Sequence, residues 1–375
     1  PTPTLDQLAA QGIVFDQVYS AEISPRSVRW NWLTGRWAFA QRDAALHRLP
    51  ELLWEHGIPA VVIGDERSRS THRLGSSGWE QQHWIRQDRL EPLEQESLLG
   101  GTVQTAIEWL KGNLGLENWL LWLELGALLP PWDPANFDAE ALEGLDQAQL
   151  EPLFGPGAGP LAPVELERAA ATYAGVISGV DQWLGMLIGQ LGELGLLGDV
   201  LIVLTSDCGM PLGEHGVLGV APPFLHQELI HLPLLLRLPN AHEAGRRVQQ
   251  LAQPVDLLPT LLDAFSLPVP PETQGRSLLG LARGEATPRR DYLCIRSRSE
   301  WAIRTHGWHL RLVEQGAQLF IKPEDRWEVN DVAGQHPDVV EHLELTLRRF
   351  RDCLARDRLD LAPELRHEIL KLQPN

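Results

Sequence analysis

The sequence has little positive charge for its length. Its 375 residues include 32 lysines and arginines against 50 aspartates and glutamates, which gives a net charge of -18. This charge repels the phosphate backbone of nucleic acids, so we expect no nucleic-acid partner. An acidic surface mainly favours solubility and therefore does not identify a substrate.

Cysteine is also scarce, and long apolar runs are lacking. Cys208, Cys294 and Cys353 form an odd set without the spacing of zinc ligands, so we expect neither a disulfide framework nor a zinc site. No window of about 18 uninterrupted apolar residues occurs, and no signal peptide opens the chain. We expect a soluble protein without a membrane partner, cytoplasmic if the start is genuine and exported if an upstream signal is missing. Its oligomeric state stays open.

The central stretch of the chain extends from Asp199 to Pro239. Its apolar run from Val200 to Leu204 ends in Thr205-Ser206-Asp207, and its length and β-branched content predict a strand buried on both faces of a parallel sheet. Ligands of open α/β sheets bind at the carboxyl ends of the strands, so Asp207 is the first carboxylate expected to do chemistry. A helix cap or turn is the alternative role.

Several ordered motifs resemble the sulfatase family of the alkaline-phosphatase superfamily. In that family a strand ends in Ser-Asp-His/Asn-Gly, and Gly-Glu/Asp-His-Gly follows. The matching segments are TSDCGMPLGEHG (205–216), LIHLPLLLRLP (229–239), TLDQLAAQG (4–12), LTGR (33–36), VDLLPTLLDAFSL (255–267) and GRSLL (275–279). The resemblance implies an α/β fold, a three-layer α/β/α sandwich with a mostly parallel sheet. It also implies a division into a sulfatase-like domain, 1–284, and a C-terminal subdomain, 285–375, with a small antiparallel sheet and a helix.

Hydrophobic patterns predict most elements of this fold. Helices are expected at 4–12, 49–56, 102–111, 163–197 and 337–354, and strands at 13–20, 58–65, 119–125, 200–204, 232–239, 292–295, 301–305, 309–313 and 318–322. The acidic and then Gly/Pro-rich stretch at 133–163 is predicted to be a surface excursion or lid.

The resemblance implies a divalent metal, calcium in the family, bound at Asp207. Relatives place His or Asn next to this aspartate, whereas this chain has Cys208. A thiolate is a poor ligand for a hard, oxygen-preferring ion. The family strand that carries two further metal-binding aspartates is not found before Thr4, so the sheet must lack a strand or fill its place from elsewhere. Whether this chain binds the ion is therefore left open.

The position of the family's nucleophile is also altered. Relatives carry a Cys, matured to formylglycine, or a Ser in a C-x-P-x-R motif before Leu-Thr-Gly-Arg. Here the segment is SAEISPRSVRWNWLTGR (20–36), and the two possible registers put Ile23 or Pro25 at the nucleophile. Neither side chain can attack an ester.

Two hydroxyls lie near that position. Ser24 and Ser27 are candidate nucleophiles at a helix N-terminus, where free N–H groups and the helix dipole stabilise negative charge. Capping of the following helix is their alternative role. Arg29 is a candidate for holding an anionic ester through a bidentate contact.

Other family groups are replaced as well. Relatives have Gly-Lys-Trp-His where this chain has 64–67, GDER, and we expect Asp65 and Glu66 to lie in a solvated loop. Relatives also end the 119–125 strand in a general-acid His that is lacking here, and a family Lys is Val220. His215 matches the family's Gly-Glu-His-Gly and either contacts substrate or hydrogen-bonds the loop. We expect mainly structural roles for Asp181, His226 and His231.

Two hypotheses about function follow. The first is a sulfatase or a phosphoester hydrolase that acts on a small sulfate or phosphate ester with Ser24 or Ser27 as nucleophile. The second is a pseudoenzyme that uses the cleft to bind an anionic ligand or a partner protein through Arg29, Arg67 and His215. The joint loss of so many reacting groups favours the second, with the family's sulfate-ester hydrolysis weak or lost.

Overall fold

A computed structural model describes residues 1–40, 47–69, 78–87, 97–130, 132, 157–158, 163–219, 224–285, 290–356, 358, 362–365 and 369. The predicted excursion at 133–163 lies almost entirely outside this described part, and so do Val220 and most of the C-terminal tail. None of the described helices is long and apolar enough to cross a membrane.

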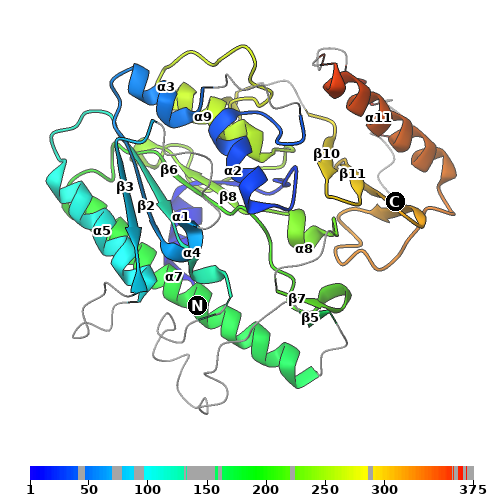
Figure 1. Ribbon diagram of the computed structural model, residues 1–375, viewed down its shortest axis with the longest axis horizontal. Helices are drawn as coiled ribbons and strands as arrows, with labels where there is room; N and C mark the ends of the chain where they lie inside the picture. Colours follow the sequence, from blue (N-terminus) through cyan, green and yellow to red (C-terminus); the bar gives the residue numbers. More distant parts are fainter. Residues whose placement is uncertain are drawn as a thin grey trace.

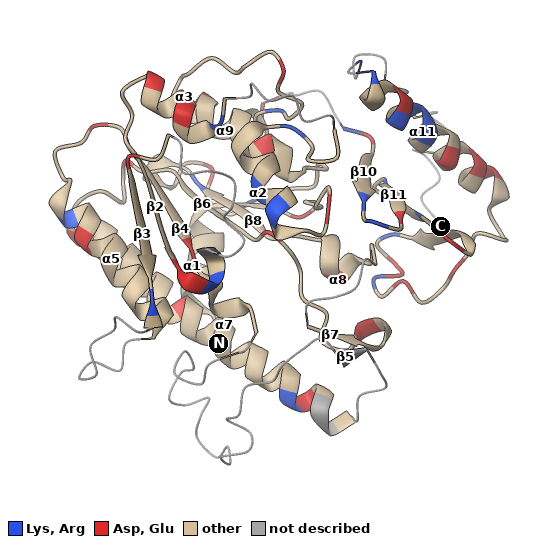
Figure 2. Ribbon diagram, in the orientation of Figure 1, with Lys and Arg blue, Asp and Glu red and all other residues tan. Residues whose placement is uncertain are grey.

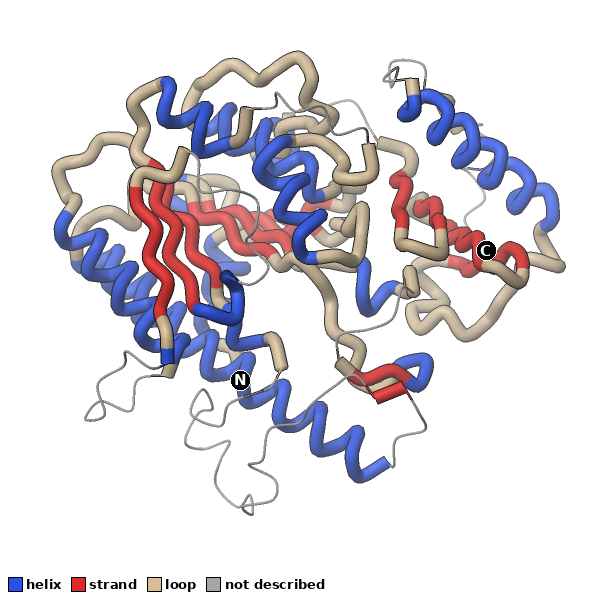
Figure 3. Tube along the Cα trace, in the orientation of Figure 1, coloured by secondary structure: helices blue, strands red, loops and turns tan. Residues whose placement is uncertain are grey.

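The strands of the α/β part form two larger sheets (Figure 3). In one sheet the order is β3-β2-β4, and all three strands are parallel. In the other the order is β6-β8-β1-β9, with β8 antiparallel to both of its neighbours. The bounds are β1 Ile13–Phe15, β2 Ala60–Asp65, β3 Gln81–Ile85, β4 Leu120–Glu124, β6 Ile202–Thr205, β8 Leu234–Arg237 and β9 Arg246–Val248; a separate antiparallel pair joins β5 Gly157–Ala158 to β7 Val217–Leu218.

Strands β4 and β6 are where predicted, but the burial on both faces that was predicted for β6 is wrong. Each lies at the edge of its sheet, and among the described strands β4 pairs only with β2 and β6 only with β8. β6 is therefore part of an antiparallel pair and not of a parallel ladder. All but one of their side chains are only partly buried, because an edge strand has a packed neighbour on one side alone. The central strand β2, by contrast, is buried along its whole length.

Helices cover both faces of these strands, as the three-layer prediction requires (Figure 1). Apolar side chains of α5 and α7 pack against one face of β2 and β4, and those of α2, α3 and α9 pack against the other. The bounds are α1 Pro3–Gln11, α2 Pro25–Thr34, α3 Leu49–Glu55, α4 Glu66–Arg69, α5 Leu98–Gly112, α7 Pro163–Glu193, α8 Gln227–Ile230, α9 Leu257–Ala264 and α10 Leu279–Ala282. The helices predicted at 4–12, 49–56, 102–111 and 163–197 are thereby confirmed.

The C-terminal part is an antiparallel meander covered by one helix. Its four strands pair in sequence order, and α11 (Pro337–Ala355) lies across them. The helix contributes apolar residues at intervals of three and four, while basic and acidic residues both occur along it (Figure 2). The strands are β10 Leu293–Arg296, β11 Trp301–Arg304, β12 Trp308–Val313 and β13 Gly316–Ile321, close to their predicted positions.

Asp181 has the structural role expected for it. Its carboxylate on α7 accepts hydrogen bonds from the main-chain N–H groups of Thr4 (3.0 Å) and Leu5 (2.7 Å) in the first turn of α1. A Ser or Thr side chain at a helix N-cap accepts such hydrogen bonds within its own helix, but here the acceptor comes from a distant part of the chain.

We predict that Asp181→Ala lowers the free energy of unfolding by about 1–2 kcal/mol, because two N–H groups of α1 lose their acceptor. Asp199→Ala, which removes an exposed carboxylate just after α7, should have no comparable effect. Urea denaturation of both variants provides the measurement. Equal stability of the two variants would contradict the capping role.

Candidate active site

Helix α2 carries the two candidate nucleophiles in its first turn. Ser24 is the N-cap residue, and its carbonyl accepts hydrogen bonds from the N–H groups of Ser27 (2.9 Å) and Val28 (3.0 Å). The Ser24 side chain is exposed and makes no capping hydrogen bond, whereas Ser27 is buried within the helix. Capping by both hydroxyls is therefore wrong, because Ser24 caps through its main chain and Ser27 lies inside the helix.

The guanidinium of Arg29 bridges the ends of two strands. Its Nη2 lies 3.1 Å from Oδ2 of Asp207 and 3.4 Å from Oε2 of Glu124. Its Nη1 donates a hydrogen bond of 3.3 Å to the carbonyl oxygen of Ser68 on α4. The Arg29 side chain is 8 % exposed, so these contacts form in a weakly screened environment.

Asp65 fixes the turn that carries Ser68, and it does not lie in a solvated loop. It is the last residue of β2 and is 1 % exposed, whereas Glu66 is exposed as predicted. Its carboxylate accepts hydrogen bonds from the N–H groups of Ser68 and Gly126, both at 2.8 Å. The prediction for Asp65 is wrong because these two N–H groups replace water around the carboxylate.

Glu124 is a site residue that the sequence interpretation missed. It is the buried last residue of β4, and Asp207 lies two residues beyond the last residue of β6, so both are at the carboxyl ends of their strands. The rule that singled out Asp207 would also have found Glu124, because polar residues directly after buried runs gather at the same edge of a sheet.

Electrostatics at Asp207 and Cys208 disfavour a hard metal ion. Burial raises the pKa of Asp207, although Arg29 opposes this shift. Burial and the neighbouring aspartate raise the pKa of the Cys208 thiol to about 12, so the sulfur carries its proton at neutral pH. No group of three or more His, Cys, Asp or Glu side chains in the described part of the chain is arranged to hold an ion. These residues do not fit the calcium site that the resemblance implies.

His215 lies in a strained turn of the loop that follows Asp207. It has a positive φ of 52° within the 3-10 turn η4 (Glu214–Gly216), a conformation that non-glycine residues adopt mainly at functional or tightly determined positions. Its Nε2 lies 3.6 Å from Oε1 of Glu228, and its ring stacks on that of His226 with 3.6 Å between centroids. Burial lowers the pKa of His215, which favours the neutral ring.

A buried network, which we call the Glu328 cluster, holds His226 in place. The Glu328 carboxylate contacts Nδ1 of His226 (2.7 Å), Nδ1 of His309 (2.7 Å) and Nζ of Lys322 (2.8 Å). Arg311 also contacts the His226 ring and pairs with Glu300. These partners hold the pKa of Glu328 below its usual value against the effect of burial. His226 is therefore more than an ordinary packed histidine.

The remaining candidates have less direct roles. His231 packs structurally, since its Nε2 lies 2.9 Å from the Asp16 carbonyl oxygen and its ring stacks on Tyr19. Arg67 is half-buried on α4, close to the Arg29 contact at Ser68. The described residues therefore bring Arg29 and Asp207 together, and they link His215 to a separate cluster.

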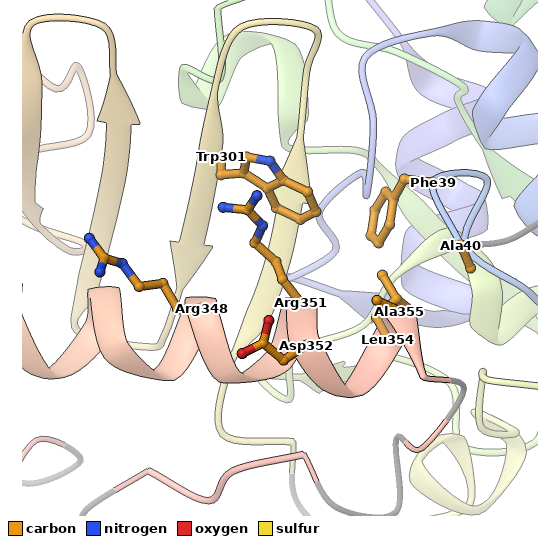
Figure 4. Close-up of a pocket in the computed structure, with 8 residues that line it drawn as sticks. All are labelled: Phe39, Ala40, Trp301, Arg348, Arg351, Asp352, Leu354 and Ala355. Carbon is orange, nitrogen blue, oxygen red and sulfur yellow. The ribbon is translucent and has the colours of Figure 1, made fainter.

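A cavity of about 720 Å³ lies elsewhere, between α11 and the C-terminal sheet (Figure 4). Phe39, Trp301 and Arg351 line it, and the Arg351 guanidinium stacks 4.7 Å from the centre of the Trp301 ring. It contains none of the residues predicted to do chemistry, so we place the candidate active site at the carboxyl ends of β4 and β6.

Comparisons with known proteins match most of the chain to two family models. The family model "Sulfatase" matches residues 1–267, and the model "N-sulphoglucosamine sulphohydrolase, C-terminal" matches residues 213–334. The N-acetylglucosamine-6-O-sulfatase of Bacteroides thetaiotaomicron is 28% identical over 202 residues, which cover 48% of this chain and 36% of that protein. The aligned part thus spans about a third of that curated relative.

Two solved structures share the fold. The phosphonate monoester hydrolase of Agrobacterium radiobacter superposes with a TM-score of 0.75 at 18% identity, covering 94% of this chain and 91% of that chain. A structure solved in complex with D-glucosamine-2-N,6-O-disulfate gives a TM-score of 0.74 at 20% identity, covering 96% and 94%. At these identities the likeness concerns the fold alone.

Glu228 makes the stability of this region depend on pH. Burial raises its pKa from 4.5 to about 7, and Glu328 and Glu214 add to the shift while Arg311 opposes it. Between these two values the unfolded chain has lost the Glu228 proton and the folded chain keeps it. The stabilising contribution of the Glu228 proton is therefore fully present below about pH 4.5. It declines as pH rises and is lost above about pH 7.

We predict that Glu228→Gln reduces the fall in melting temperature between about pH 5 and about pH 8, because glutamine has no proton to lose. Glu117→Gln removes an exposed carboxylate and serves as the matched control. Thermal unfolding followed by circular dichroism at both pH values tests this. An identical fall in Glu228→Gln and wild type would refute the assignment.

Proposed function

Because the chain belongs to the sulfatase family, we propose that it keeps the family's cleft as a binding site for a sulfated small molecule and that hydrolysis is weak or lost. The observation that carries this proposal is the Arg29 cluster. Arg29, which would hold the ester, and Asp207, which would hold the ion, neutralise each other. Glu124 adds a second carboxylate to the same guanidinium.

The chemistry of ester hydrolysis needs groups that this cluster does not supply. A sulfuryl transfer requires an activated nucleophile, cations that stabilise the developing charge, and an acid for the leaving group. Arg29 is paired with carboxylates, and the lowered pKa of His215 favours a neutral ring. The residues present therefore favour binding over turnover.

Two features support binding of an anion near α2. The exposed Ser24 hydroxyl lies at the N-terminus of α2, where the helix dipole favours negative charge. Nε of Arg29 is buried and has no hydrogen-bond partner among the described residues. A ligand oxygen would satisfy that donor.

Ligand class follows from the relatives. One aligned relative is named for N-acetylglucosamine 6-O-sulfate, and one fold neighbour was solved with a disulfated glucosamine. We therefore propose a sulfated amino sugar as the ligand. We also propose that 1–284 and 285–375 are the two folding units, with the cleft formed mainly by the first.

A second candidate function is hydrolysis of a sulfate or phosphate ester with Ser24 as the nucleophile. Its uncommitted, exposed hydroxyl at a helix N-terminus is the observation in its favour, since the helix dipole lowers the cost of forming an alkoxide there. Ser27 is a weaker candidate because it is buried within the helix.

Turnover and metal content distinguish the two functions. We predict that purified protein contains substoichiometric divalent metal by elemental analysis. With chromogenic aryl sulfate and aryl phosphate, its rates should stay at background and be the same in Ser24→Ala, Ser27→Ala and Asp207→Ala. A working group of this kind typically contributes about 10²–10³-fold to the rate. Turnover that Ser24→Ala or Asp207→Ala abolishes would establish the hydrolase instead.

A further inference from the structure

An exposed tryptophan lies next to the His215 loop. Trp327 follows β13 and is 52 % exposed, so about half of a large aromatic side chain faces solvent. The exposed Arg326 side chain lies against it, with its guanidinium carbon 5.0 Å from the centre of the ring. An aromatic face and a cation are thus presented together at the surface.

Buried contacts hold the loop that carries Arg326 and Trp327. Glu328, the next residue, is 4 % exposed and has a positive φ of 53°, and its carboxylate is held by the histidines and lysine of the Glu328 cluster. Lys322 also donates hydrogen bonds to Gln227 (2.9 Å) and to the Asp325 carbonyl oxygen (2.8 Å). These buried contacts fix the main chain on both sides of Trp327, so its exposed position is imposed by the fold.

The same loop contacts His215, which follows Asp207 in the chain. The main chain of Trp327 hydrogen-bonds the His215 ring, and His215 stacks on His226, which Glu328 holds. His215 in turn belongs to the loop that begins at Asp207. Trp327 and Arg326 are therefore linked through the His215 ring to the loop that begins at Asp207.

Pairs of this kind suit a charged sugar. The apolar C–H face of a pyranose ring packs on an indole ring, while guanidinium N–H groups bind sulfate oxygens in a charge-assisted, bidentate manner. A flat apolar ligand would not need the arginine, and a bare sulfate ion would not need the tryptophan. Because the chain has a net charge of -18, it also requires local positive groups to bind an anion.

We propose that Trp327 and Arg326 form a subsite that binds the ring and the sulfate group of a sulfated amino sugar beside His215. This inference rests on the proposed function, because it takes its ligand class from that proposal. The subsite selects the ligand and takes no part in bond breaking.

Calorimetric titrations at low ionic strength test the subsite without requiring turnover. The probes are glucosamine 6-sulfate, glucosamine and inorganic sulfate. We expect wild type to bind glucosamine 6-sulfate most tightly, and Trp327→Ala to weaken this binding about fivefold or more. Arg326→Gln should weaken binding of the sulfated sugar and leave binding of glucosamine unchanged.

Two matched controls come from the same chain. Trp54→Ala removes a tryptophan that is 62 % exposed on α3, and Arg349→Gln removes an exposed arginine on α11. Both should bind the sulfated sugar like wild type, and all four variants should keep the wild-type melting temperature because the altered side chains are exposed.

Two results overturn the subsite. One is wild-type affinity in Trp327→Ala, and the other is failure of wild type to bind glucosamine 6-sulfate more tightly than the two simpler probes. Neither depends on whether the protein hydrolyses esters. Turnover of an aryl sulfate would refute the proposed loss of activity and leave these titrations interpretable.

Discussion

The guanidinium of Arg29 joins parts of the molecule that backbone pairing leaves separate. Strands β4 and β6 lie at the edges of two different sheets, and their terminal carboxylates, Glu124 and Asp207, meet on this one side chain. Its third contact, to the Ser68 carbonyl, ties in the turn after β2. A buried cation between two carboxylates compensates charges that would otherwise be costly to bury, so the geometry of this edge depends on Arg29.

The same interaction limits what the site can do. A guanidinium that is committed to two carboxylates holds an ester less strongly, and a carboxylate that is paired with it is a poorer metal ligand. On our proposal, binding contributions then come from exposed groups, namely the Ser24 hydroxyl at the start of α2 and the side chains of Arg326 and Trp327. The Glu328 cluster is important for this reason, because it positions His226 under His215 and leaves Trp327 exposed. On our proposal, ligand recognition and structural support thus lie on opposite sides of one short loop.

Local patterns predicted much of the fold, and long-range pairing explains what they missed. β2 and the C-terminal meander have periodic or continuous apolar runs, so their positions could be read directly. Burial of β4 and β6 could not, because it depends on which strands pair across the sheet. Asp65 was expected in a loop and Glu124 was given no role, since their partners, Gly126 and Arg29, are 61 and 95 positions away by number. Likewise, nothing local to His226 indicates Glu328, 102 residues later.

A double-mutant cycle between Arg29 and Asp207 tests the central interaction most directly. The cycle compares the free energies of unfolding of wild type, Arg29→Met, Asp207→Asn and the double variant, so that contributions not shared by the pair cancel. Our account predicts a coupling energy above about 2 kcal/mol at neutral pH, because Arg29→Met leaves the Asp207 charge buried without its cation and Asp207→Asn removes one of the two carboxylates that neutralise Arg29. A coupling energy near zero would mean that the two side chains are independent, and it would contradict the account.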